Sequence, residues 1–363
     1  MRRSFKFMHI LLLPKYSRKA ASTRCRYLQY IQYLESCGFK CTVSPLFNDE
    51  YLEKRFSVGR AGIVNIVLAL VNRITTIIFS NKYDVIILHC EAFPYLTPFL
   101  EKYLAFRKIK YIYDYDDAIF HNYDQHLSRL VRWLLREKIA KVIAGAKGVI
   151  AGNKYLANYA LKVNSNVYII PTVIDLNRFH RQRVHRPDKT FTIGWIGSPT
   201  TTKYVEMVAE ALSEVCSTGD CKVILIGAGK VSLPGINVES RVWSEDDEVK
   251  DMQDFDVGIM PLTDGPWERG KCGFKLIQYM ACSLPVVASP VGVNSEIVES
   301  GKNGFLAKSK ADWIHALNTL RNDKELRQRM GDAGRKKIEE QYCLQVTAPK
   351  FVAVLQKMTN GNR

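Results

Sequence analysis

The side chains best suited to chemistry lie in and just after a polar, glycine-rich loop in the second half of the chain. The loop contains Lys271 and Gly273, and a helical pattern that starts near Phe274 carries Lys275 and Gln278. If this helix begins early, Lys271, Lys275 and Gln278 line one face toward its N-terminus. Ammonium groups and backbone amides at a helix start suit a diphosphate, and Gln278 can hydrogen-bond ribose hydroxyls. A solvated charged loop that caps an ordinary helix is the alternative.

A second candidate anion site follows an apolar segment that ends near residue 196. Gly197 comes next, then Ser198 as a good N-cap, Pro199 as a natural first helical residue, and Thr200. A glycine at this turn lets a ligand approach the backbone, and the exposed amides suit a phosphate. Isolated glycine turns are weak signals, so a strand–turn–helix unit without a ligand is the alternative.

Acidic side chains follow two apolar segments in the first half of the chain. Asp116 and Asp117 come after one segment, and Glu91 comes after an earlier one. Carboxylates at the carboxyl ends of strands can orient a sugar or accept the proton of an acceptor hydroxyl. Together with Asp114 the two aspartates also suggest a metal site, but no further ligand cluster is visible, and we expect no metal. Asp117 or Glu91 can instead cap a helix.

A basic loop follows the first apolar segment. Arg24 and Arg26 stand out there because two guanidinium groups can clamp a phosphate of donor or acceptor. A solvated basic loop is the alternative.

Short apolar segments, with amphipathic stretches between them, run along the whole chain. They are residues 10–13, 41–45, 85–89, 111–115, 148–151 and 167–171 in the first half, and residues 191–196, 222–226, 238–243, 257–261, 285–288 and 304–307 in the second. Apolar strands separated by helices, such as those expected over residues 26–37 and 125–144, specify parallel sheets covered on both faces. The sequence therefore predicts an α/β chain of two doubly wound, Rossmann-like domains facing a central cleft.

The polar, basic stretch over residues 175–190 cannot join a core and marks the boundary between them. We expect domains over residues 1–175 and 191–340, a linker over residues 176–190, and a C-terminal helix over residues 341–363 that can cross back to the first domain.

The net charge of +16 is distributed unevenly. Residues 1–180 carry 27 Lys and Arg against 13 Asp and Glu, a net of +14, and the remainder carries 25 against 23. The first half therefore meets something anionic: phospholipid, a phosphorylated glycan or, less well supported because no motif accompanies the charge, nucleic acid. The helix expected over residues 125–144 has leucines on one side and arginines opposite, which suits an anionic membrane surface, although an ordinary surface helix is the commoner explanation.

Neither of the most apolar stretches predicts a segment that crosses a membrane. Residues 7–13 are short and lack a cleavage site, and residues 61–80 are interrupted by two asparagines and an arginine. The nine scattered cysteines have no metal-binding spacing and indicate reduced thiols. We expect a cytoplasmic protein, peripheral on the inner face of the plasma membrane.

The longest ordered motif is QYMACSLPVVASPVGVNSEIVESGKNGFLA, residues 278–307. It resembles the donor-binding signature of the retaining glycosyltransferase family 4, and weaker likeness covers most of residues 80–345. The resemblance implies the GT-B fold, an N-terminal acceptor-binding domain, a C-terminal nucleotide-sugar domain, and catalysis without a metal or other cofactor. It also places Asp116 and Asp117 near the transferring sugar.

The sequence departs from that family at one pair of positions. The family has two glutamates eight positions apart, and the corresponding residues here are Gly270 and Gln278. Gln278 can still bond a ribose, and Glu268 can replace the missing carboxylate through a shifted loop. Gly273 matches the family's loop glycine.

The sequence thus predicts an enzyme that transfers a sugar from a UDP- or GDP-linked donor to a lipid-linked or surface glycan, with retention. Lys271, Lys275 and the Ser198 turn would neutralise the leaving diphosphate. The alternatives are a sugar-nucleotide epimerase or hydrolase on the same fold and a non-catalytic scaffold that binds the sugar nucleotide.

Overall fold

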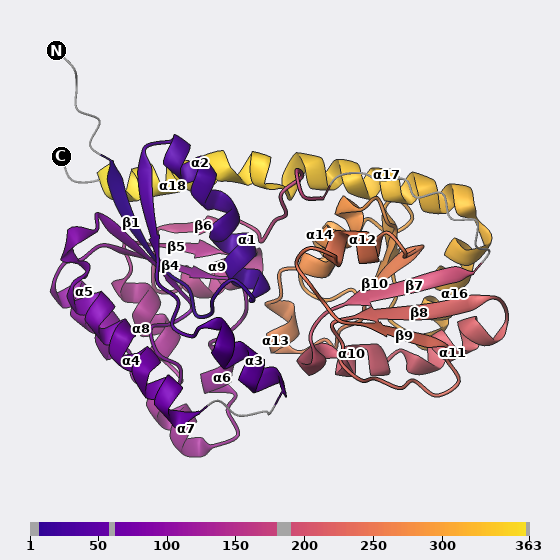
Figure 1. Cartoon of the computed structure of the whole chain (residues 1–363), viewed down its shortest axis with the longest axis horizontal. Coiled ribbons are helices and arrows are strands. Elements are labelled where there is room, and N and C mark those ends of the chain that lie inside the picture. The colour runs from indigo at the N-terminus through magenta and orange to yellow at the C-terminus, as the bar shows by residue number, and fades with distance from the viewer. Residues whose placement is uncertain (1–6, 58–61, 180–189, 361–363) are drawn as a thin grey trace, which may run out of the picture. The chain divides into compact units, whose positions relative to one another are not determined.

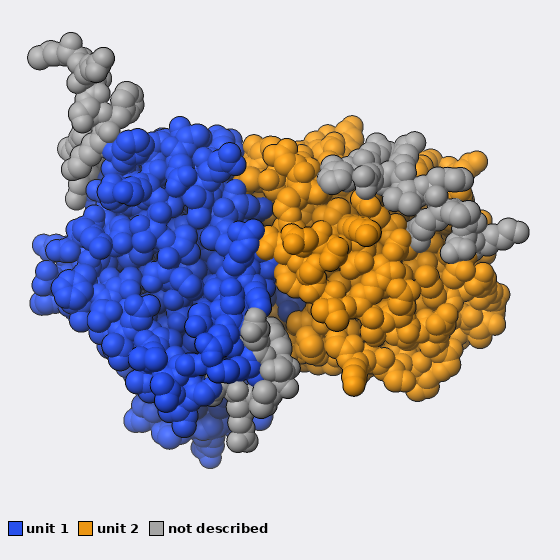
Figure 2. Space-filling model, in the orientation of Figure 1, with its two compact units in different colours: residues 1–172, 270–272, 347–363 blue, residues 173–269, 273–346 orange. Residues whose placement is uncertain are grey.

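The computed structural model describes residues 7–57, 62–179 and 190–360. The chain forms two compact units, which Figure 2 colours separately: unit 1 is residues 1–172, 270–272 and 347–363, and unit 2 is residues 173–269 and 273–346. The linker expected over residues 176–190 lies mostly outside the described residues. The domain limits inferred from the sequence stay predictions.

Unit 1 is built on a six-stranded parallel sheet with the order β2-β1-β3-β4-β5-β6 (Figure 1). Its strands are β1 (Met8–Leu13), β2 (Phe39–Val43), β3 (Val85–His89), β4 (Tyr111–Tyr115), β5 (Gly148–Ala151) and β6 (Val167–Ile169). Every residue of β3, β4 and β5 is buried. Strands that are buried on both faces require near-continuous apolar sequence, which is the pattern that these segments show.

Eleven short helical elements accompany this sheet among the described residues. They are α1 (Ala21–Arg26), η1 (Leu28–Tyr30), α2 (Ile31–Ser36), α3 (Asp49–Ser57), α4 (Ile63–Ile78), η2 (Ser80–Lys82), α5 (Phe99–Phe106), α6 (His121–Asp124), α7 (Arg129–Leu135), α8 (Lys138–Gly145) and α9 (Lys154–Ala160). The helix expected over residues 26–37 is confirmed over residues 28–36, where η1 runs directly into α2, and it starts after Tyr27 (φ −130°, ψ −61°). The single helix expected over residues 125–144 is wrong, because α7 and α8 are separated at Glu137 (φ −99°, ψ 4°).

The long C-terminal helix α18 (Leu344–Asn360) starts in unit 2 and belongs to unit 1 from Thr347 onward. Near its start, α18 contacts Tyr30 in the N-terminal part of unit 1. The Tyr30 hydroxyl lies 2.8 Å from Thr347 Oγ1, and the Tyr30 ring centroid lies 5.0 Å from that of Phe351.

Unit 2 repeats the architecture with the strand order β12-β11-β10-β7-β8-β9, all parallel. Its strands are β7 (Phe191–Ile196), β8 (Cys221–Ile226), β9 (Val238–Arg241), β10 (Val257–Met260), β11 (Val286–Ala288) and β12 (Gly304–Leu306). Its helices are η3 (Pro199–Thr201), α10 (Lys203–Glu206), α11 (Ala209–Ser217), α12 (Glu248–Met252), α13 (Pro266–Arg269), α14 (Phe274–Ala281), α15 (Asn294–Ile297), α16 (Lys310–Asn322) and α17 (Lys324–Gln341).

Two hydrophobic cores cover the two faces of this second sheet. Ile224 and Ile226 pack in one core with α14, whereas Val223 and Leu225 pack in the other with α11 and α16. Alternate residues of one strand point to opposite faces, so a strand that is apolar at every position needs both cores.

The structure confirms the predicted fold class, because each unit is an α/β assembly on a parallel six-stranded sheet. No helix among the described residues is long and apolar enough to cross a membrane.

Candidate functional site

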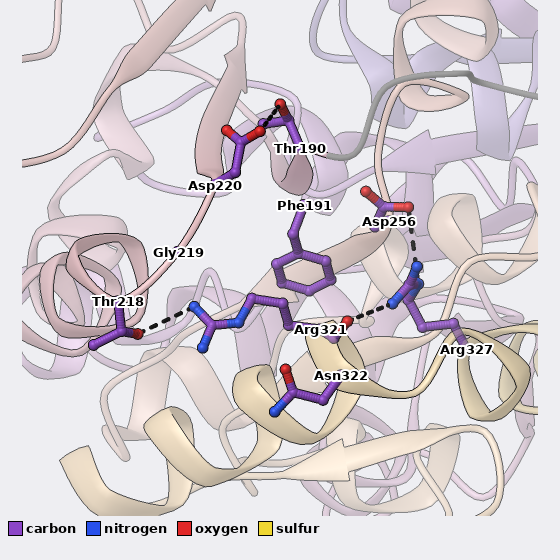
Figure 3. Close-up of a pocket in the computed structure, with 9 residues that line it drawn as sticks. All are labelled: Thr190, Phe191, Thr218, Gly219, Asp220, Asp256, Arg321, Asn322 and Arg327. Atoms are coloured by element: carbon purple, nitrogen blue, oxygen red, sulfur yellow. Dashed lines mark hydrogen bonds and ion pairs between the residues drawn. The ribbon is translucent and has the colours of Figure 1, made fainter.

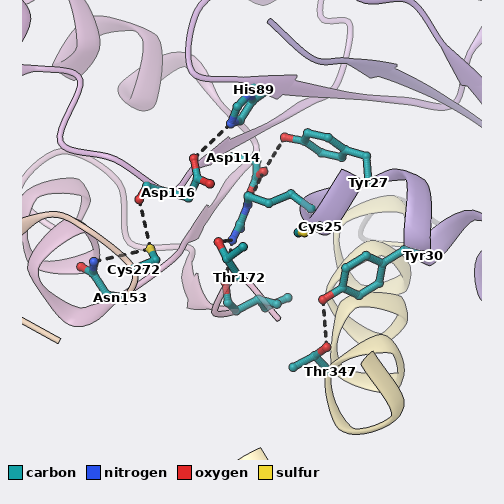
Figure 4. Close-up of polar contacts among 12 residues, drawn as sticks. Cys25, Tyr27, Tyr30, His89, Asp114, Asp116, Asn153, Thr172, Cys272 and Thr347 are labelled. Atoms are coloured by element: carbon teal, nitrogen blue, oxygen red, sulfur yellow. Dashed lines mark hydrogen bonds and ion pairs between the residues drawn. The ribbon is translucent and has the colours of Figure 1, made fainter. Parts of the chain in front are cut away.

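The carboxyl ends of β3 and β4 bring together the acids predicted in unit 1, because these parallel strands are neighbours in the sheet. Asp114 is the fourth residue of β4, and Asp116 follows the strand (Figure 4). Glu91 comes two residues after β3 ends. The three carboxylates differ in their partners, and the partners decide what each can do.

Asp114 is held in a buried ion pair with Arg26. The Arg26 guanidinium donates to both carboxylate oxygens, its Nη1 donates to the Ile170 carbonyl at 3.1 Å and Thr172 Oγ1 at 3.2 Å, and the Tyr27 hydroxyl also donates to Asp114. Burial disfavours the charged guanidinium, but Asp114 raises the pKa of Arg26 well above its ordinary value. The structure therefore gives Arg26 a different task from the predicted phosphate clamp.

Arg24 also turns inward. Its Nη1 donates to the carbonyls of Arg18 and Lys19, both at 2.9 Å, and the side chain is buried. It thereby shapes the loop between β1 and α1.

Glu91 is engaged in a second buried ion pair. Its carboxylate accepts from Lys138 Nζ and from the Tyr123 hydroxyl, and Lys15 Nζ lies 3.6 Å away. Burial lowers the pKa of Lys138, and Glu91 opposes that shift. Because its side chain is 1% exposed and already paired, Glu91 is not open to an acceptor as the sequence predicted.

Asp116 has a different partner, His89, whose importance the sequence analysis missed. His89 Nε2 lies 3.3 Å from Asp116 Oδ1, and the His89 ring meets the Tyr27 ring edge-on. Burial alone would lower the pKa of His89, but Cys90 and Asp116 raise it well above its ordinary value. Burial would raise the pKa of Asp116, but His89 and then Arg26 lower it. The two opposed shifts favour an imidazolium beside a carboxylate.

The backbone between His89 and Glu91 is strained. Cys90 has φ +66°, a left-handed conformation that costs roughly 1–3 kcal/mol in a residue other than glycine. Strain of this kind persists at functional sites, where the surroundings fix it. His89 could have been found from sequence, since it is the last residue of a predicted strand whose carboxyl end faces the site.

Asp117 lies next to this group but does not cap a helix. α6 begins at His121, with Phe120 at its N-cap position, so the capping alternative is wrong for that helix.

A possible cation cluster also differs from the expected one. Among the described residues, the metal-type ligands within 4.8 Å of one another are His89, Cys90 and Asp116, and Asp114 belongs to Arg26. The absence of a metal stays a prediction.

The segment Gly270–Cys272 packs in unit 1 beside Asp116. Asn153 Nδ2 donates to the carbonyls of Gly270 (2.8 Å) and Lys271 (3.1 Å), and Cys272 Sγ donates to the Asp116 carbonyl at 3.0 Å (Figure 4). The Asn153 Oδ1 caps α9 at the Leu156 amide. One side chain thus fixes the backbone that carries Lys271, and the sequence analysis missed it.

The same packing explains the glycine where the family has a glutamate. A Cβ atom at Gly270 would lie 2.4 Å from Ala118 Cβ and 3.0 Å from the Ala118 nitrogen. No larger side chain fits there without movement of the backbone. The departure at Gly270 is therefore a packing requirement of this chain.

In unit 2 the predicted turn after β7 has the expected capping chemistry. Ser198 and Thr201 form a capping box, and Pro199 opens η3, which includes Thr200. The Gly197 backbone lies close to Gly227, the residue that directly follows β8. A Cβ atom at Gly227 would come 2.3 Å from the Gly197 carbonyl oxygen. The turn is therefore tight, and its backbone is close to the carboxyl end of β8.

The start of α14 holds most of the other predicted donor residues. Gly273 is its N-cap in the left-handed conformation (φ +65°), Phe274 is the first helical residue, and Lys275 Nζ lies 5.4 Å from the centre of the Trp195 ring. Gln278 is buried. Because α14 begins at Phe274, Lys271 precedes the helix, and the predicted face of Lys271, Lys275 and Gln278 does not exist.

Two further polar residues of unit 2 lie near this helix or its loop. Asn294 is 1% exposed, and its Oδ1, which would lie 3.6 Å from a Cβ at Gly273, has no hydrogen-bond partner among the described residues. Such an orphan acceptor next to a helix start is suited to a ligand hydroxyl. Glu268 in α13 is also buried and accepts from the Tyr204 hydroxyl.

A cavity of about 350 Å³ in unit 2 lies away from these residues (Figure 3). It is lined by Phe191, Asp220, Asp256, Arg321 and Arg327 among others. Phe191 begins β7, and Asp220 and Asp256 precede β8 and β10. The cavity therefore opens at the amino ends of the strands, opposite the edge where α/β folds bind ligands.

Comparisons with known proteins find a family match and several proteins with the same fold. Residues 190–323 match the family described as glycosyl transferases group 1. N-acetyl-alpha-D-glucosaminyl L-malate synthase from Bacillus anthracis is 22% identical over 297 residues, which are 76% of this chain and 75% of that protein.

Solved structures share the fold at low sequence identity. Sucrose-phosphate synthase from Thermosynechococcus elongatus has a TM-score of 0.73 at 14% identity, over 98% of this chain and 100% of that one. HepE from Anabaena, in complex with UDP and glucose, has a TM-score of 0.66 at 16% identity, over 96% and 99%. The chain thus has the GT-B fold, carries a glycosyl transferases group 1 domain at residues 190–323, and is an enzyme of the glycosyltransferase class.

Proposed function

We propose that this glycosyltransferase takes its sugar from a nucleoside diphosphate donor, linked to uridine or guanosine, that binds at the start of α14. The observation that carries the proposal is the left-handed Gly273 followed by the amides of a buried helix, with Lys275 in its first turn. The first amides of a helix have no partner within it and attract phosphate oxygens. The likeness to HepE, which was solved with UDP and glucose, supports a donor of this kind.

Lys275 and Lys271 then supply the positive charge that the leaving diphosphate needs. Two ammonium groups and aligned backbone dipoles stabilise the developing charge without a metal ion or another cofactor. The Ser198 turn adds further amides at the neighbouring strand end. Asn294 Oδ1 accepts a hydroxyl of the donor.

Asp116 is the carboxylate that we assign to the transferring sugar or to the proton of the acceptor hydroxyl. Asp114 and Glu91 are each held in a buried ion pair with an arginine or a lysine. Asp116 instead pairs with His89, which favours its ionised form, and its side chain stays partly exposed. Retention of configuration follows from the family resemblance.

The proposed acceptor is a lipid-linked or surface glycan, met at the inner face of the plasma membrane. The net charge of +14 over residues 1–180 supports an anionic acceptor or surface. Nucleic acid is not proposed.

The donor site is tested by thermal shift with UDP, GDP and their sugars on the wild type, Lys275→Ala, Lys271→Ala and the control Lys324→Ala. Lys324 is an exposed lysine of unit 2, at the first position of α17. We expect a selective upward shift that the first two changes abolish and the control keeps. A shift that survives both changes, or none with any nucleotide, would overturn the proposal. Donor breakdown that needs no acceptor would instead indicate an epimerase or hydrolase, and binding without turnover would indicate a scaffold.

A further inference from the structure

α4 presents a stripe of apolar side chains to solvent. The exposed fractions of six of them lie between 45% and 79%: Ile63, Val64, Val67, Leu68, Val71 and Ile78. These positions recur at helical spacing, so they share one side of the helix. Singly exposed leucines are normal in soluble proteins, but a contiguous exposed apolar stripe marks an interaction surface.

The opposite side of α4 is fixed to the body of unit 1. Ile77 is fully buried, and Arg73, which is 1% exposed, donates from Nη2 to the carbonyls of Pro14 (2.8 Å) and Ser44 (3.1 Å). Pro14 and Ser44 directly follow β1 and β2, so these contacts anchor α4 at the carboxyl edge of the sheet. The exposed stripe therefore belongs to a docked helix and does not result from a helix detached from its core.

A second group of exposed apolar side chains lies on and just before α7. Leu127, Leu130, Trp133 and Leu134 are 52–96% exposed, so these leucines do not pack inward as those of an ordinary surface helix would. Tryptophan favours the boundary between water and the hydrocarbon of a bilayer. In Figure 1 both α4 and α7 belong to the lower left part of unit 1.

The charges around these apolar side chains are positive. From Lys54 to Lys82 the sequence contains no Asp or Glu, and it has four Lys or Arg besides the buried Arg73. Arg129 and Arg132 lie within α7, and Arg136 directly follows it. Exposed apolar residues flanked by cations have the composition of elements that lie in the headgroup region of an anionic bilayer.

We infer that the apolar stripe of α4, together with residues 127–134, inserts into the surface of an anionic lipid bilayer. The stripe supplies apolar burial, and the flanking cations attract the headgroups. This inference specifies the membrane partner of the proposed function, but it requires neither donor binding nor catalysis. The anchoring of α4 by Arg73 at the carboxyl edge places the lipid surface on the unit that carries Asp116.

The test is co-sedimentation of the full chain, without donor, with vesicles of phosphatidylcholine alone or mixed with phosphatidylglycerol. The variants are Val67→Ser/Leu68→Ser and Trp133→Ala, and the control is Val242→Ser, which changes a still more exposed apolar residue of unit 2. We expect binding to the mixed vesicles that weakens at high salt, falls at least about tenfold in the α4 double variant and less in Trp133→Ala, and is unchanged in the control.

Three results would overturn the inference. The first is that the wild type does not bind the mixed vesicles at low salt. The second is that the α4 variant binds as tightly as the wild type. The third is a concentration-dependent dimer, seen by sedimentation velocity, that the α4 variant dissociates without any change in vesicle binding, because the stripe would then face a second copy. Thermal shift with nucleotide sugars, run on the same variants, measures donor binding independently. A failure of membrane binding can thus be distinguished from a failure of the proposed donor site.

Discussion

Asp114 and Asp116 stand two residues apart in the sequence and perform opposite tasks. Asp114 is completely buried and neutralises Arg26, whereas Asp116 faces His89 and keeps part of its side chain exposed. Sequence spacing cannot distinguish them, because the partner of Asp114 lies 88 positions away. The distinction leads to opposite expectations for the two isosteric changes.

Asp114→Asn should lower the stability of unit 1 by about 3–5 kcal/mol, since it leaves the buried Arg26 guanidinium without its counter-charge. Asp116→Asn should cost less stability than Asp114→Asn, because Asp116 keeps part of its side chain in solvent, and should lower kcat by about 100-fold or more. Urea denaturation and steady-state rates on both variants check this. Equal stability losses in the two variants would contradict the assignment.

The His89–Asp116 pair predicts how stability depends on pH. The pKa of His89 is raised in the folded state, so its contribution is fully present below its unfolded pKa of about 6.5 and is lost as pH rises through the folded value. The pKa of Asp116 is lowered, so its contribution is lost only as pH falls through that lowered value. From neutral to alkaline pH the wild type should therefore lose more stability than His89→Gln. Parallel denaturation curves at each pH would contradict the ion pair.

At the scale of elements, the sequence predicted strands far better than helices. All twelve predicted segments became strands. The limits match for β3, β4, β5 and β7, which are buried at every position, because a strand buried on both faces must be apolar throughout. The single helix predicted over residues 125–144 was wrong, because the chain leaves the helical conformation at Glu137. The next residue, Lys138, pairs with the distant Glu91, and hydrophobic periodicity does not register such a contact.

The loop between α13 and α14 shows the same limit at the site. Its glycines and lysines were recognisable, but Asn153 and Ala118, which hold it, lie more than 100 positions earlier in the chain. The position of Glu268 against Tyr204 was likewise set by a contact between distant residues.

Gly270→Ala tests this packing. The added Cβ would lie 2.4 Å from Ala118 Cβ, so we expect a loss of about 1–3 kcal/mol in stability. Ala118→Gly in the same chain removes the Cβ that the new methyl group meets, so it should restore part of the lost stability. The rescue should be incomplete, because the Ala118 nitrogen, 3.0 Å away, remains. A double-mutant cycle in urea measures the coupling. Additive effects of the two changes would show that Gly270 is not confined by Ala118.

At the scale of the whole molecule, charge and chemistry are divided between the two halves of the sequence. The first half has nearly all the net positive charge, and the second has the group 1 domain with the left-handed glycine and buried helix start. Each unit presents its chemistry at the carboxyl ends of its strands, which is the edge where doubly wound sheets bind ligands. The proposed donor site and the proposed acceptor surface can therefore be tested separately.

The central claim is that the chain transfers a sugar from a nucleoside diphosphate donor bound at α14. The most direct measurement is release of nucleoside diphosphate from UDP- and GDP-sugars, with and without a lipid extract that contains glycan acceptors, for the wild type, Lys275→Ala and Lys324→Ala. We expect release that depends on the acceptor, is nearly abolished in Lys275→Ala and is unchanged in Lys324→Ala. Acceptor-dependent release that is equally fast in Lys275→Ala, or no release from any nucleotide sugar, would contradict it.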